Sequence, residues 1–277
     1  MKSEASMTID DKRARLGAIL RGYGKAAVAF SGGVDSSFLC AAAREELGEG
    51  AAAITIVSPM LPKSELDDAK KVAAMVGIRH VLVEAGELEE EVAANPADRC
   101  YHCKKREFGS IARAARELGI GFVLDGTNVD DEGDYRPGMR AIAELGVASP
   151  LREAGLGKEE IRELSRRSGL PTWDKPAFAC LASRIPYGER IDAAKLSRIE
   201  RAEDYLRGLG LRQFRVRSHG ELARIEVAPE ERRKLYADGT LDAMAAAFES
   251  FGFMYSCLDL AGYRRGSLNK AIGEGRA

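Results

Sequence analysis

The chain has 277 residues, of which 45% are hydrophobic and 31% are charged, and its formal net charge at pH 7 is −1. This length exceeds what one hydrophobic core normally holds, so we expect two domains, 1–175 and 176–277. No run of about 18 apolar residues is present to span a bilayer, and residues 1–15 carry no apolar signal segment, which favours the cytoplasm. The nearly balanced charge also gives no general attraction to nucleic acid.

The region 26–151 alternates short apolar runs with amphipathic stretches, which is typical of βα units around a parallel sheet. The predicted strands are 26–30, 52–57, 80–84 and 122–125, and the predicted helices are 36–47, 63–75 and 104–118. This order predicts an α/β domain with a doubly wound parallel sheet. Its ligands should lie beyond the carboxyl ends of the strands, where the loops 31–35, 58–63 and 126–134 come together.

The second half of the chain has a different pattern. A stretch rich in proline and glycine, 169–188, predicts an ordered loop between domains. After it we predict a helix at 192–209, a hairpin of strands 214–217 and 222–227 around His219-Gly220, helices at 230–237 and 241–251, and a strand at 254–259. These elements predict a smaller C-terminal α+β domain.

The segment Ser31-Gly32-Gly33-Val34-Asp35-Ser36-Ser37 directly follows the first predicted strand. Its two glycines let the backbone approach an anion, and the next helix points free N–H groups and its positive end at the same place. It is neither GxxxxGK[ST] nor GxGxxG, but it resembles the PP-loop of the ATP pyrophosphatase superfamily, which splits ATP into AMP and pyrophosphate to adenylate a substrate. The expected ATP contacts are Ser31, Gly32, Gly33, Asp35, Ser36, Ser37, Ser58, Gly126 and Thr127.

A second segment, Leu124-Asp125-Gly126-Thr127-Asn128-Val129-Asp130-Asp131, is similar to the one with which this superfamily completes its ATP and magnesium site. One or two carboxylates together with phosphate oxygens suit Mg²⁺, which neutralises the leaving pyrophosphate. The candidate Mg²⁺ ligands are Asp35, Asp130 and Asp131. For each of them the alternative is an acidic residue in a solvated turn.

The five cysteines divide into two groups by their sequence context. Cys100, Cys103 and Cys180 lie in polar, loop-like segments, whereas Cys40 and Cys257 lie in apolar patterns and are expected in the core. In a reducing compartment a CxxC pair is more often a metal, cluster or redox site than a disulfide.

Cys180 lies near Lys175 and Arg184 in the sequence. Positive surroundings lower the pKa of a thiol and favour the nucleophilic thiolate, which beside an adenylating site indicates sulfur transfer. The alternative is an inert loop cysteine.

Four segments together carry a closer resemblance. They are the PP-loop, Arg99-Cys-Tyr-His-Cys-Lys104, Lys175-Pro-Ala-Phe-Ala-Cys-Leu-Ala-Ser-Arg184-Ile-Pro-Tyr-Gly188, and Arg215-Val-Arg-Ser-His-Gly-Glu-Leu-Ala-Arg-Ile-Glu226-Val227. They look like the LarE family, the ATP-dependent sulfur transferases of nickel-pincer nucleotide biosynthesis, over a region from about Ile19 to Ser267. The resemblance implies that ATP adenylates a carboxylate of pyridinium-3,5-biscarboxylic acid mononucleotide, that sulfur displaces AMP to give a thiocarboxylate, and that a second round treats the other carboxylate.

The sulfur source differs within the family. Some members sacrifice the sulfur of a lone cysteine at the Cys180 position, and others hold a [4Fe-4S] cluster on three cysteines. Because this sequence has Cys100, Cys103 and Cys180, the resemblance favours the cluster, whose fourth iron is free for exogenous sulfide. A sacrificial Cys180, a zinc site that includes His102 and a redox CxxC pair are the alternatives.

An anionic nucleotide substrate needs arginine or lysine side chains. The candidates are Lys104, Arg184, Arg215, Arg217 and Arg264, with Glu226 to orient them or to bind metal, and the alternative for each is a solvated or ion-paired surface charge. Arg136 and Arg140 lie in a further family-like segment but have no assigned role.

The resemblance also implies a homo-oligomer, an unidentified sulfide donor and handover to the nickel-inserting enzyme. The rival functions are a tRNA-thiolating PP-loop enzyme, an amidotransferase-type synthetase and a non-catalytic nucleotide sensor.

Overall fold

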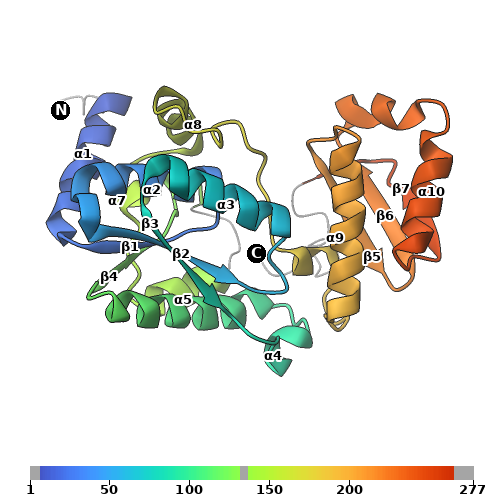
Figure 1. The fold of residues 1–277 in the computed structure, drawn as a ribbon, viewed down its shortest axis with the longest axis horizontal. Coiled ribbons are helices and arrows are strands. Elements are labelled where there is room, and N and C mark those ends of the chain that lie inside the picture. Colours follow the sequence, from blue (N-terminus) through green and yellow to red (C-terminus); the bar gives the residue numbers. More distant parts are fainter. Residues whose placement is uncertain (1–6, 132–136, 265–277) are drawn as a thin grey trace, which may run out of the picture. The chain divides into compact units, whose positions relative to one another are not determined.

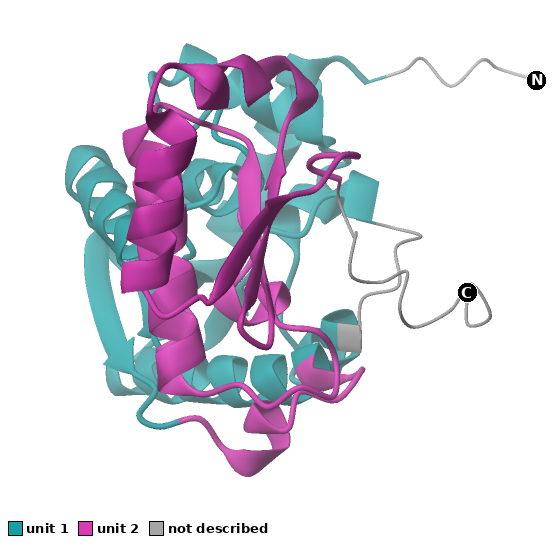
Figure 2. Ribbon diagram, turned by 90° about the vertical axis from the view of Figure 1, so that its right-hand side faces the viewer, with its two compact units in different colours: residues 1–58, 63–87, 100–177 teal, residues 59–62, 88–99, 178–277 magenta. Residues whose placement is uncertain are grey.

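The structure, a computed structural model, describes residues 7–131 and 137–264. The chain forms two compact units, each made of several segments (Figure 2). Unit 1 comprises 1–58, 63–87 and 100–177, and unit 2 comprises 59–62, 88–99 and 178–277. The two short segments 59–62 and 88–99 thus join unit 2 although they come from the first half of the chain. The roles assigned above to the two predicted domains stay predictions.

The four strands of unit 1 form one parallel sheet. They are β1 (Ala26–Ala29), β2 (Ala51–Val57), β3 (Arg79–Glu84) and β4 (Phe122–Leu124), in the order β3-β2-β1-β4. All four strands were predicted, and their parallel pairing is confirmed. Strands β2 and β3, which follow β1 in the chain, lie on one side of β1, and β4 lies on its other side. The direction in which successive strands are added to the sheet therefore reverses at β1. In such sheets the ligand site lies beyond the carboxyl ends of the strands at this point.

Helices cover both faces of this sheet (Figure 1). One face carries α1 (Ile9–Tyr23), α2 (Val34–Leu47), α3 (Lys63–Val76), α7 (Pro150–Glu153) and α8 (Lys158–Arg167), and the other carries α5 (Arg99–Glu117) and α6 (Pro137–Glu144). The predicted doubly wound α/β class is therefore confirmed. Shorter elements are η1 (Gly48–Gly50) and η2 (Val129–Asp131), whereas α4 (Glu90–Ala93) lies in the segment 88–99 of unit 2.

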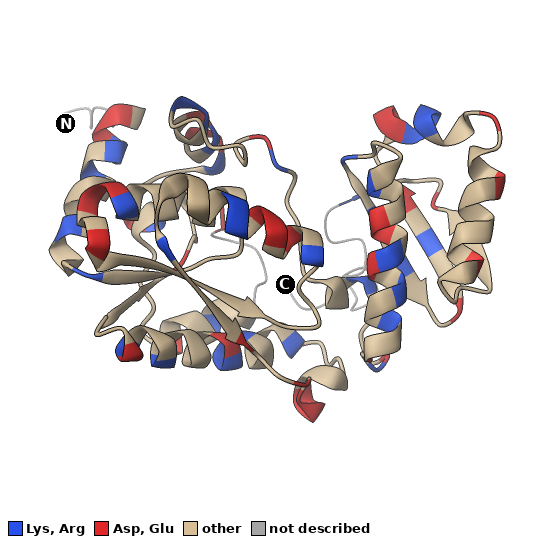
Figure 3. Ribbon diagram, viewed as in Figure 1, with Lys and Arg blue, Asp and Glu red and all other residues tan. Residues whose placement is uncertain are grey.

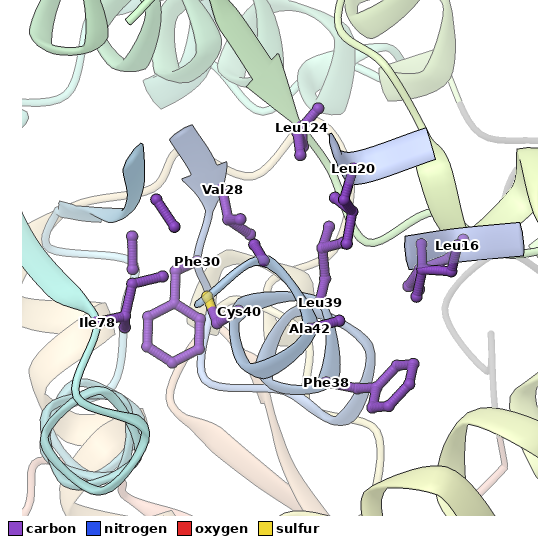
Figure 4. Packing of buried hydrophobic residues seen from close by; sticks show 14 of the residues in the cluster. Leu16, Leu20, Val28, Phe30, Phe38, Leu39, Cys40, Ala42, Ile78 and Leu124 are labelled. Atoms are coloured by element: carbon purple, nitrogen blue, oxygen red, sulfur yellow. The ribbon is translucent and has the colours of Figure 1, made fainter. Parts of the chain in front are cut away.

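The strands place alternate side chains in the two cores. Val28 packs with α1 and α2, whereas Ala27 packs with α5 on the opposite face, as the period of a strand requires. Figure 4 shows Val28 and Phe30 beside Leu39 and Cys40 of α2. Strands β1, β2 and β4 contain no charged residue, while Figure 3 shows both signs of charge interspersed on the helices. This distribution explains the alternating pattern of the sequence.

Unit 2 is a small α+β arrangement, as predicted. It contains η3 (Leu181–Arg184), α9 (Ala193–Gly208), β5 (Phe214–His219), β6 (Leu222–Val227), η4 (Pro229–Tyr236), α10 (Thr240–Ser250) and β7 (Tyr255–Leu258). The hairpin prediction is confirmed, because β5 and β6 pair antiparallel, and β7 adds parallel to β6. The predicted helix at 230–237 is a 3-10 helix that buries Leu235 alone, so it lacks an apolar stripe at α-helical spacing.

One further difference concerns a single residue. Cys40 is fully buried as expected, but Cys257 is exposed, so its prediction as a core residue is wrong. The reason is that β7 is an edge strand whose side chains are mostly exposed. Within residues 7–131 and 137–264, no helix is both long and apolar enough to cross a membrane.

Candidate active site

The PP-loop segment connects β1 to α2, as predicted. Gly33 occupies the N-cap position of α2, and Gly32 has a φ of +71°, a conformation that favours glycine. A Cβ atom on Gly32 would also lie 3.0 Å from the Cβ atom of Ala69 on α3. Gly32 is therefore required both by its backbone angle and by the close approach of α3. The first N–H groups of an α-helix lack intrahelical partners, so the start of α2 suits an anion at this loop, and phosphate binding there stays a prediction.

The serines of the loop have different surroundings. The Ser36 hydroxyl accepts a hydrogen bond from Ser31 N at 3.3 Å and lies 3.1 Å from the Ser31 hydroxyl, which closes the loop over the start of α2. Ser37 is fully buried, and its hydroxyl has no hydrogen-bond partner among the described residues. Ser58 follows β2 and is half-buried. A phosphate contact by any of these serines stays a prediction.

The loop after β4 lies against the PP-loop helix, as predicted from the topology. A Cβ atom on Gly126 would lie 3.1 Å from Ser36 N and 3.2 Å from the Cβ atom of Asp35. Thr127 is buried, and its hydroxyl donates to Asp125 Oδ2 at 2.6 Å while its N–H donates to Asp125 Oδ1 at 3.2 Å. The two motifs thus meet at the point where the strand order reverses.

The three candidate magnesium ligands differ in what they bind. Asp35 Oδ2 accepts a hydrogen bond from Lys158 Nζ at 2.5 Å. Asp130 accepts from the N–H of Lys158 at 2.6 Å and so caps α8, and Asp131 accepts from Asn128 N at 3.1 Å. In the described part of the chain no three His, Cys, Asp or Glu side chains form a group able to hold a metal. By its donor chemistry and its place on the first turn of α2, Asp35 fits an Mg²⁺ ion bound to phosphate oxygens.

Lys158 is a residue of this site that the sequence did not single out. It stands at the start of α8, 123 positions along the chain from Asp35. A single lysine after a glycine has no pattern of its own, so no local signal pointed to it.

Cys100 and Cys103 belong to unit 1. They lie on the first turns of α5, and a spacing of three residues places them on one face of the helix. Both are partly buried, and Cys103 Sγ lies 3.3 Å from Glu107 Oε1. Lys104 Nζ pairs with Glu107 Oε2 at 3.0 Å, so one carboxylate contacts both a thiol and a lysine.

Cys180 belongs to unit 2, directly before η3, and its side chain is exposed. The Arg184 guanidinium donates to the carbonyl oxygens of Ala179 at 2.6 Å and Cys180 at 3.0 Å. Lys175 binds carboxylates of unit 1 instead, so its charge is already compensated. A cluster on Cys100, Cys103 and Cys180 stays a proposal, as do the zinc and redox alternatives.

Arg184 is fully buried and forms a bidentate ion pair with Glu203. Its Nε and Nη2 atoms lie 2.9 and 2.8 Å from the two carboxylate oxygens. Burial opposes the charged form of each group, but the pairing outweighs it, so the pKa of Arg184 is raised and the pKa of Glu203 is lowered. Arg184 thus shapes the main chain on both sides of Cys180.

The other candidate substrate arginines of unit 2 are also mostly buried. Arg217 lies opposite Arg224 on β6 and binds Glu226 Oε2 at 2.9 Å and the carbonyl oxygen of Ser183 at 2.8 Å. Arg215 stacks on Phe178, 4.6 Å from the ring centroid, and burial together with the Arg184 charge lowers its pKa to about 10.

Arg264, which is partly exposed, lies 3.8 Å from Asp259. Arg140 stacks over the Tyr101 ring at 4.0 Å, whereas Arg136 lies outside the described residues. None of these contacts assigns a substrate role to the arginines, and the substrate contacts of Lys104, Arg184, Arg215, Arg217, Glu226 and Arg264 stay predictions.

Asn95 and Arg99 are a buried, hydrogen-bonded pair that the sequence analysis did not single out. Asn95 Nδ2 lies 2.7 to 3.3 Å from the carbonyl oxygens of Ile185, Pro186 and Glu189. Arg99 Nη1 donates to Asn95 Oδ1 at 2.5 Å and to the Ala182 carbonyl at 3.1 Å. The segment that leads into Cys100 is therefore bound to the segment that follows Cys180. The Asn-Pro dipeptide at 95–96 is a turn signal, which was the one local indication.

Comparisons with known proteins show which families this chain resembles. The asparagine synthase family model matches residues 18–126, which include the PP-loop. An uncharacterized protein of Synechocystis is 47% identical over 90% of this chain and 93% of its own length. The pyridinium-3,5-bisthiocarboxylic acid mononucleotide synthase of Lactiplantibacillus plantarum is 35% identical over 96% of both chains. A tRNA-specific 2-thiouridylase of Pelobacter propionicus is 31% identical over 54% of this chain and 52% of its own.

The partial matches cover about half of this chain, whereas the match to the bisthiocarboxylic acid synthase extends over nearly all of both chains. An alignment of this extent spans the positions of the PP-loop, the cysteine segments and the arginine-rich hairpin. The chain therefore belongs to the LarE family of pyridinium-3,5-bisthiocarboxylic acid mononucleotide synthases, built on a PP-loop α/β fold.

Proposed function

We propose that this protein is an ATP-dependent sulfur transferase of nickel-pincer nucleotide synthesis. It would convert the carboxylates of pyridinium-3,5-biscarboxylic acid mononucleotide into thiocarboxylates. The observation that carries the proposal is the 35% identity, over 96% of both chains, to a synthase of the bisthiocarboxylic acid product. The two features that such a reaction needs are both present, namely the phosphate loop of unit 1 and the exposed thiol of Cys180 in unit 2.

The first step activates the substrate carboxylate. A carboxylate oxygen attacks the α-phosphorus of ATP, the bond from that phosphorus to the bridging oxygen breaks, and pyrophosphate leaves. The N–H groups at the start of α2 stabilise the charge on the phosphates, and Asp35 would hold Mg²⁺, which would supply positive charge to the leaving pyrophosphate. The product is an acyl adenylate, in which AMP is a good leaving group.

The second step transfers sulfur to the acyl carbon, and the carbon–oxygen bond to AMP breaks. For the sulfur source we propose a [4Fe-4S] cluster, which Cys100, Cys103 and Cys180 would hold and which would supply the sulfide for transfer. Support comes from the donor set, because all three are cysteines outside the core and two of them share one helix face. The alternative is that the Cys180 thiolate attacks the acyl carbon itself. Loss of its Cα proton and cleavage of the Cβ–S bond then release the thiocarboxylate and leave dehydroalanine.

Oxygen-free protein with ATP, Mg²⁺ and the biscarboxylic precursor tests the function. We expect one AMP and one pyrophosphate for each carboxylate that becomes a thiocarboxylate, with no AMP formed when the precursor is omitted. Formation of AMP without a sulfur-containing product would contradict sulfur transfer, and no precursor-dependent pyrophosphate at all would indicate a nucleotide sensor.

Iron and acid-labile sulfide in oxygen-free protein test the sulfur source. With a cluster, both are present and both fall in Cys100→Ala and Cys103→Ala. If these two variants keep full sulfur transfer, the cluster is refuted. Mass spectrometry of the spent protein then shows whether Cys180 has lost the elements of H₂S. Cys257→Ala, which removes an exposed cysteine from an edge strand, is the matched control.

The remaining parts of the proposal concern the surroundings of the reaction. We place it in the cytoplasm, on a homo-oligomer that receives sulfide from an unidentified donor and hands its product to the nickel-inserting enzyme. Neither nucleic acid nor a membrane is needed as a partner.

A further inference from the structure

The Lys175 side chain makes an unusual set of contacts within unit 1. It is 13% exposed, and its Nζ atom lies 2.9 Å from Asp68 Oδ2 and 3.1 Å from Glu65 Oε2, both on α3. The same ammonium donates to the carbonyl oxygen of Gly32 at 3.4 Å. An ammonium has three N–H donors, and here three acceptors surround it, one of which belongs to the phosphate loop.

The contact between Lys175 and the Gly32 carbonyl also fixes the orientation of the Gly33 N–H. A trans peptide unit is planar, so the carbonyl of Gly32 and the N–H of Gly33 lie in one rigid plane and point in opposite directions within it. A bond that holds the carbonyl toward Lys175 therefore holds the Gly33 N–H pointing away from Lys175. Gly33 is the N-cap residue of α2, and its peptide belongs to the loop that approaches phosphate.

The main chain around Lys175 is held as well. Arg162 of α8 donates to the carbonyl oxygens of Trp173 at 2.6 Å and Lys175 at 3.0 Å. Lys175 N donates to the carbonyl oxygen of Thr172 at 3.0 Å. Unit 1 ends at Ala177, so Lys175 stands just before the chain leaves that unit for the segment that carries the reactive cysteine. One residue thus joins the phosphate loop to the start of that segment.

We propose that Lys175 is a positioning residue that couples the phosphate loop to the segment 172–180. It orients the Gly32–Gly33 peptide for phosphate, and a phosphate on the Gly33 N–H polarises that peptide and strengthens the bond from Lys175 to the Gly32 carbonyl. Nucleotide binding therefore restrains the main chain of 172–180. The inference rests on the ATP site of the proposed function.

Binding of a fluorescent, non-hydrolysable ATP analogue to the full chain tests whether Lys175 orients the Gly32–Gly33 peptide for phosphate. Charge-assisted hydrogen bonds of this kind predict that Lys175→Met weakens binding about tenfold, and that Lys175→Arg, which keeps charge and donors, recovers part of the loss. The matched control is Lys12→Met, because Lys12 pairs with Glu160 at 2.7 Å in the same unit without touching the loop. We expect the affinity of that control to be unchanged.

Hydrogen exchange of the peptide that spans 172–180 tests the coupling. The analogue should slow its exchange several-fold in the wild type and in Lys12→Met, but leave it unchanged in Lys175→Met. Because Lys175→Met leaves the buried Glu65 carboxylate without its cation, the double variant Lys175→Met/Glu65→Gln serves if the single variant does not fold.

Wild-type affinity in a folded Lys175→Met, or slowing of exchange by the analogue in that variant, overturns the inference. A wild type that does not bind the analogue refutes the ATP site itself, and the proposed function fails with it. The two failures are therefore distinguishable.

Discussion

Replacing Arg184 by methionine should destabilise unit 2 strongly. The change removes two charge-assisted hydrogen bonds to Glu203, of 2.9 and 2.8 Å, and the donors to two main-chain carbonyls. Glu203 has a side chain that is 2% exposed and would keep the N–H of Val216 at 3.0 Å and the more distant charge of Arg215. Removing one partner of a buried ion pair typically costs about 3–5 kcal/mol, and we expect a loss in this range.

Native-state hydrogen exchange of β5 at increasing urea measures the free energy of opening in unit 2. The double variant Arg184→Met/Glu203→Met should recover much of the lost free energy of opening, since it removes the carboxylate together with its guanidinium partner. Arg190→Met is the matched control, because Arg190 pairs with Glu90 at the surface of the same unit, and we expect little change.

The pH dependence gives an independent check of the same reasoning. The Arg184 charge helps to hold the pKa of Glu203 below its ordinary value in the folded protein. The pair therefore stabilises the wild type fully above the unfolded pKa of about 4.3, and loses this contribution as the pH falls through the lowered folded pKa. In Arg184→Met, burial instead favours the protonated acid. The difference in free energy between wild type and variant should thus shrink as the pH falls, first through the raised folded pKa of Glu203 in the variant and then through its lowered folded pKa in the wild type. A difference that stays constant from about pH 7 to the acid range would refute the explanation.

Three further predictions follow from single side chains. Gly32→Ala should abolish binding of the ATP analogue, because alanine is strained at a φ of +71° and its Cβ would lie 3.0 Å from that of Ala69; near wild-type affinity would contradict this. Asn95→Ala should lower the free energy of unfolding by about 2–3 kcal/mol, measured by urea denaturation, since three carbonyls lose their donor. Burial raises the pKa of the Cys40 thiol, so iodoacetamide at neutral pH should modify the exposed Cys257 but spare Cys40 until the protein unfolds. Mass spectrometry of the labelled peptides measures this, and labelling of Cys40 in the folded protein would contradict the explanation.

The fold of unit 1 was predictable where apolar periodicity decides it. Runs such as 26–30 and 52–57 are apolar on both faces, which is typical of central parallel strands. By contrast, α1 was not predicted, because its buried positions are limited to Leu16, Gly17 and Leu20 and charged residues surround them. The helix begins at a capping box in which Thr8 and Asp11 bond to each other's N–H groups, a signal too short to detect with confidence against loop patterns.

The candidate site was predictable to the extent that topology fixes it. The two loops that meet at Gly126 follow strands whose carboxyl ends lie at one edge of the sheet, so their proximity follows from the strand order. Lys158, Lys175 and Asn95 act through contacts with residues roughly a hundred positions away or more, and no local spacing encodes such pairs. The burial of Arg184 was not predictable either, because its partner Glu203 lies on another element, α9.

The main chain around Cys180 is held from two directions by buried cations of unit 2. Arg184 binds the carbonyls of Ala179 and Cys180, and Arg99 binds the carbonyl of Ala182. The thiol itself is exposed, so an accessible side chain stands on a fixed backbone. Such an arrangement would suit the proposed attack on an acyl adenylate, because a nucleophile whose position is already set loses less entropy in the reaction. The requirement would be the same whether the sulfur is that of Cys180 or is held beside it, so one backbone geometry would serve either of the proposed sulfur sources.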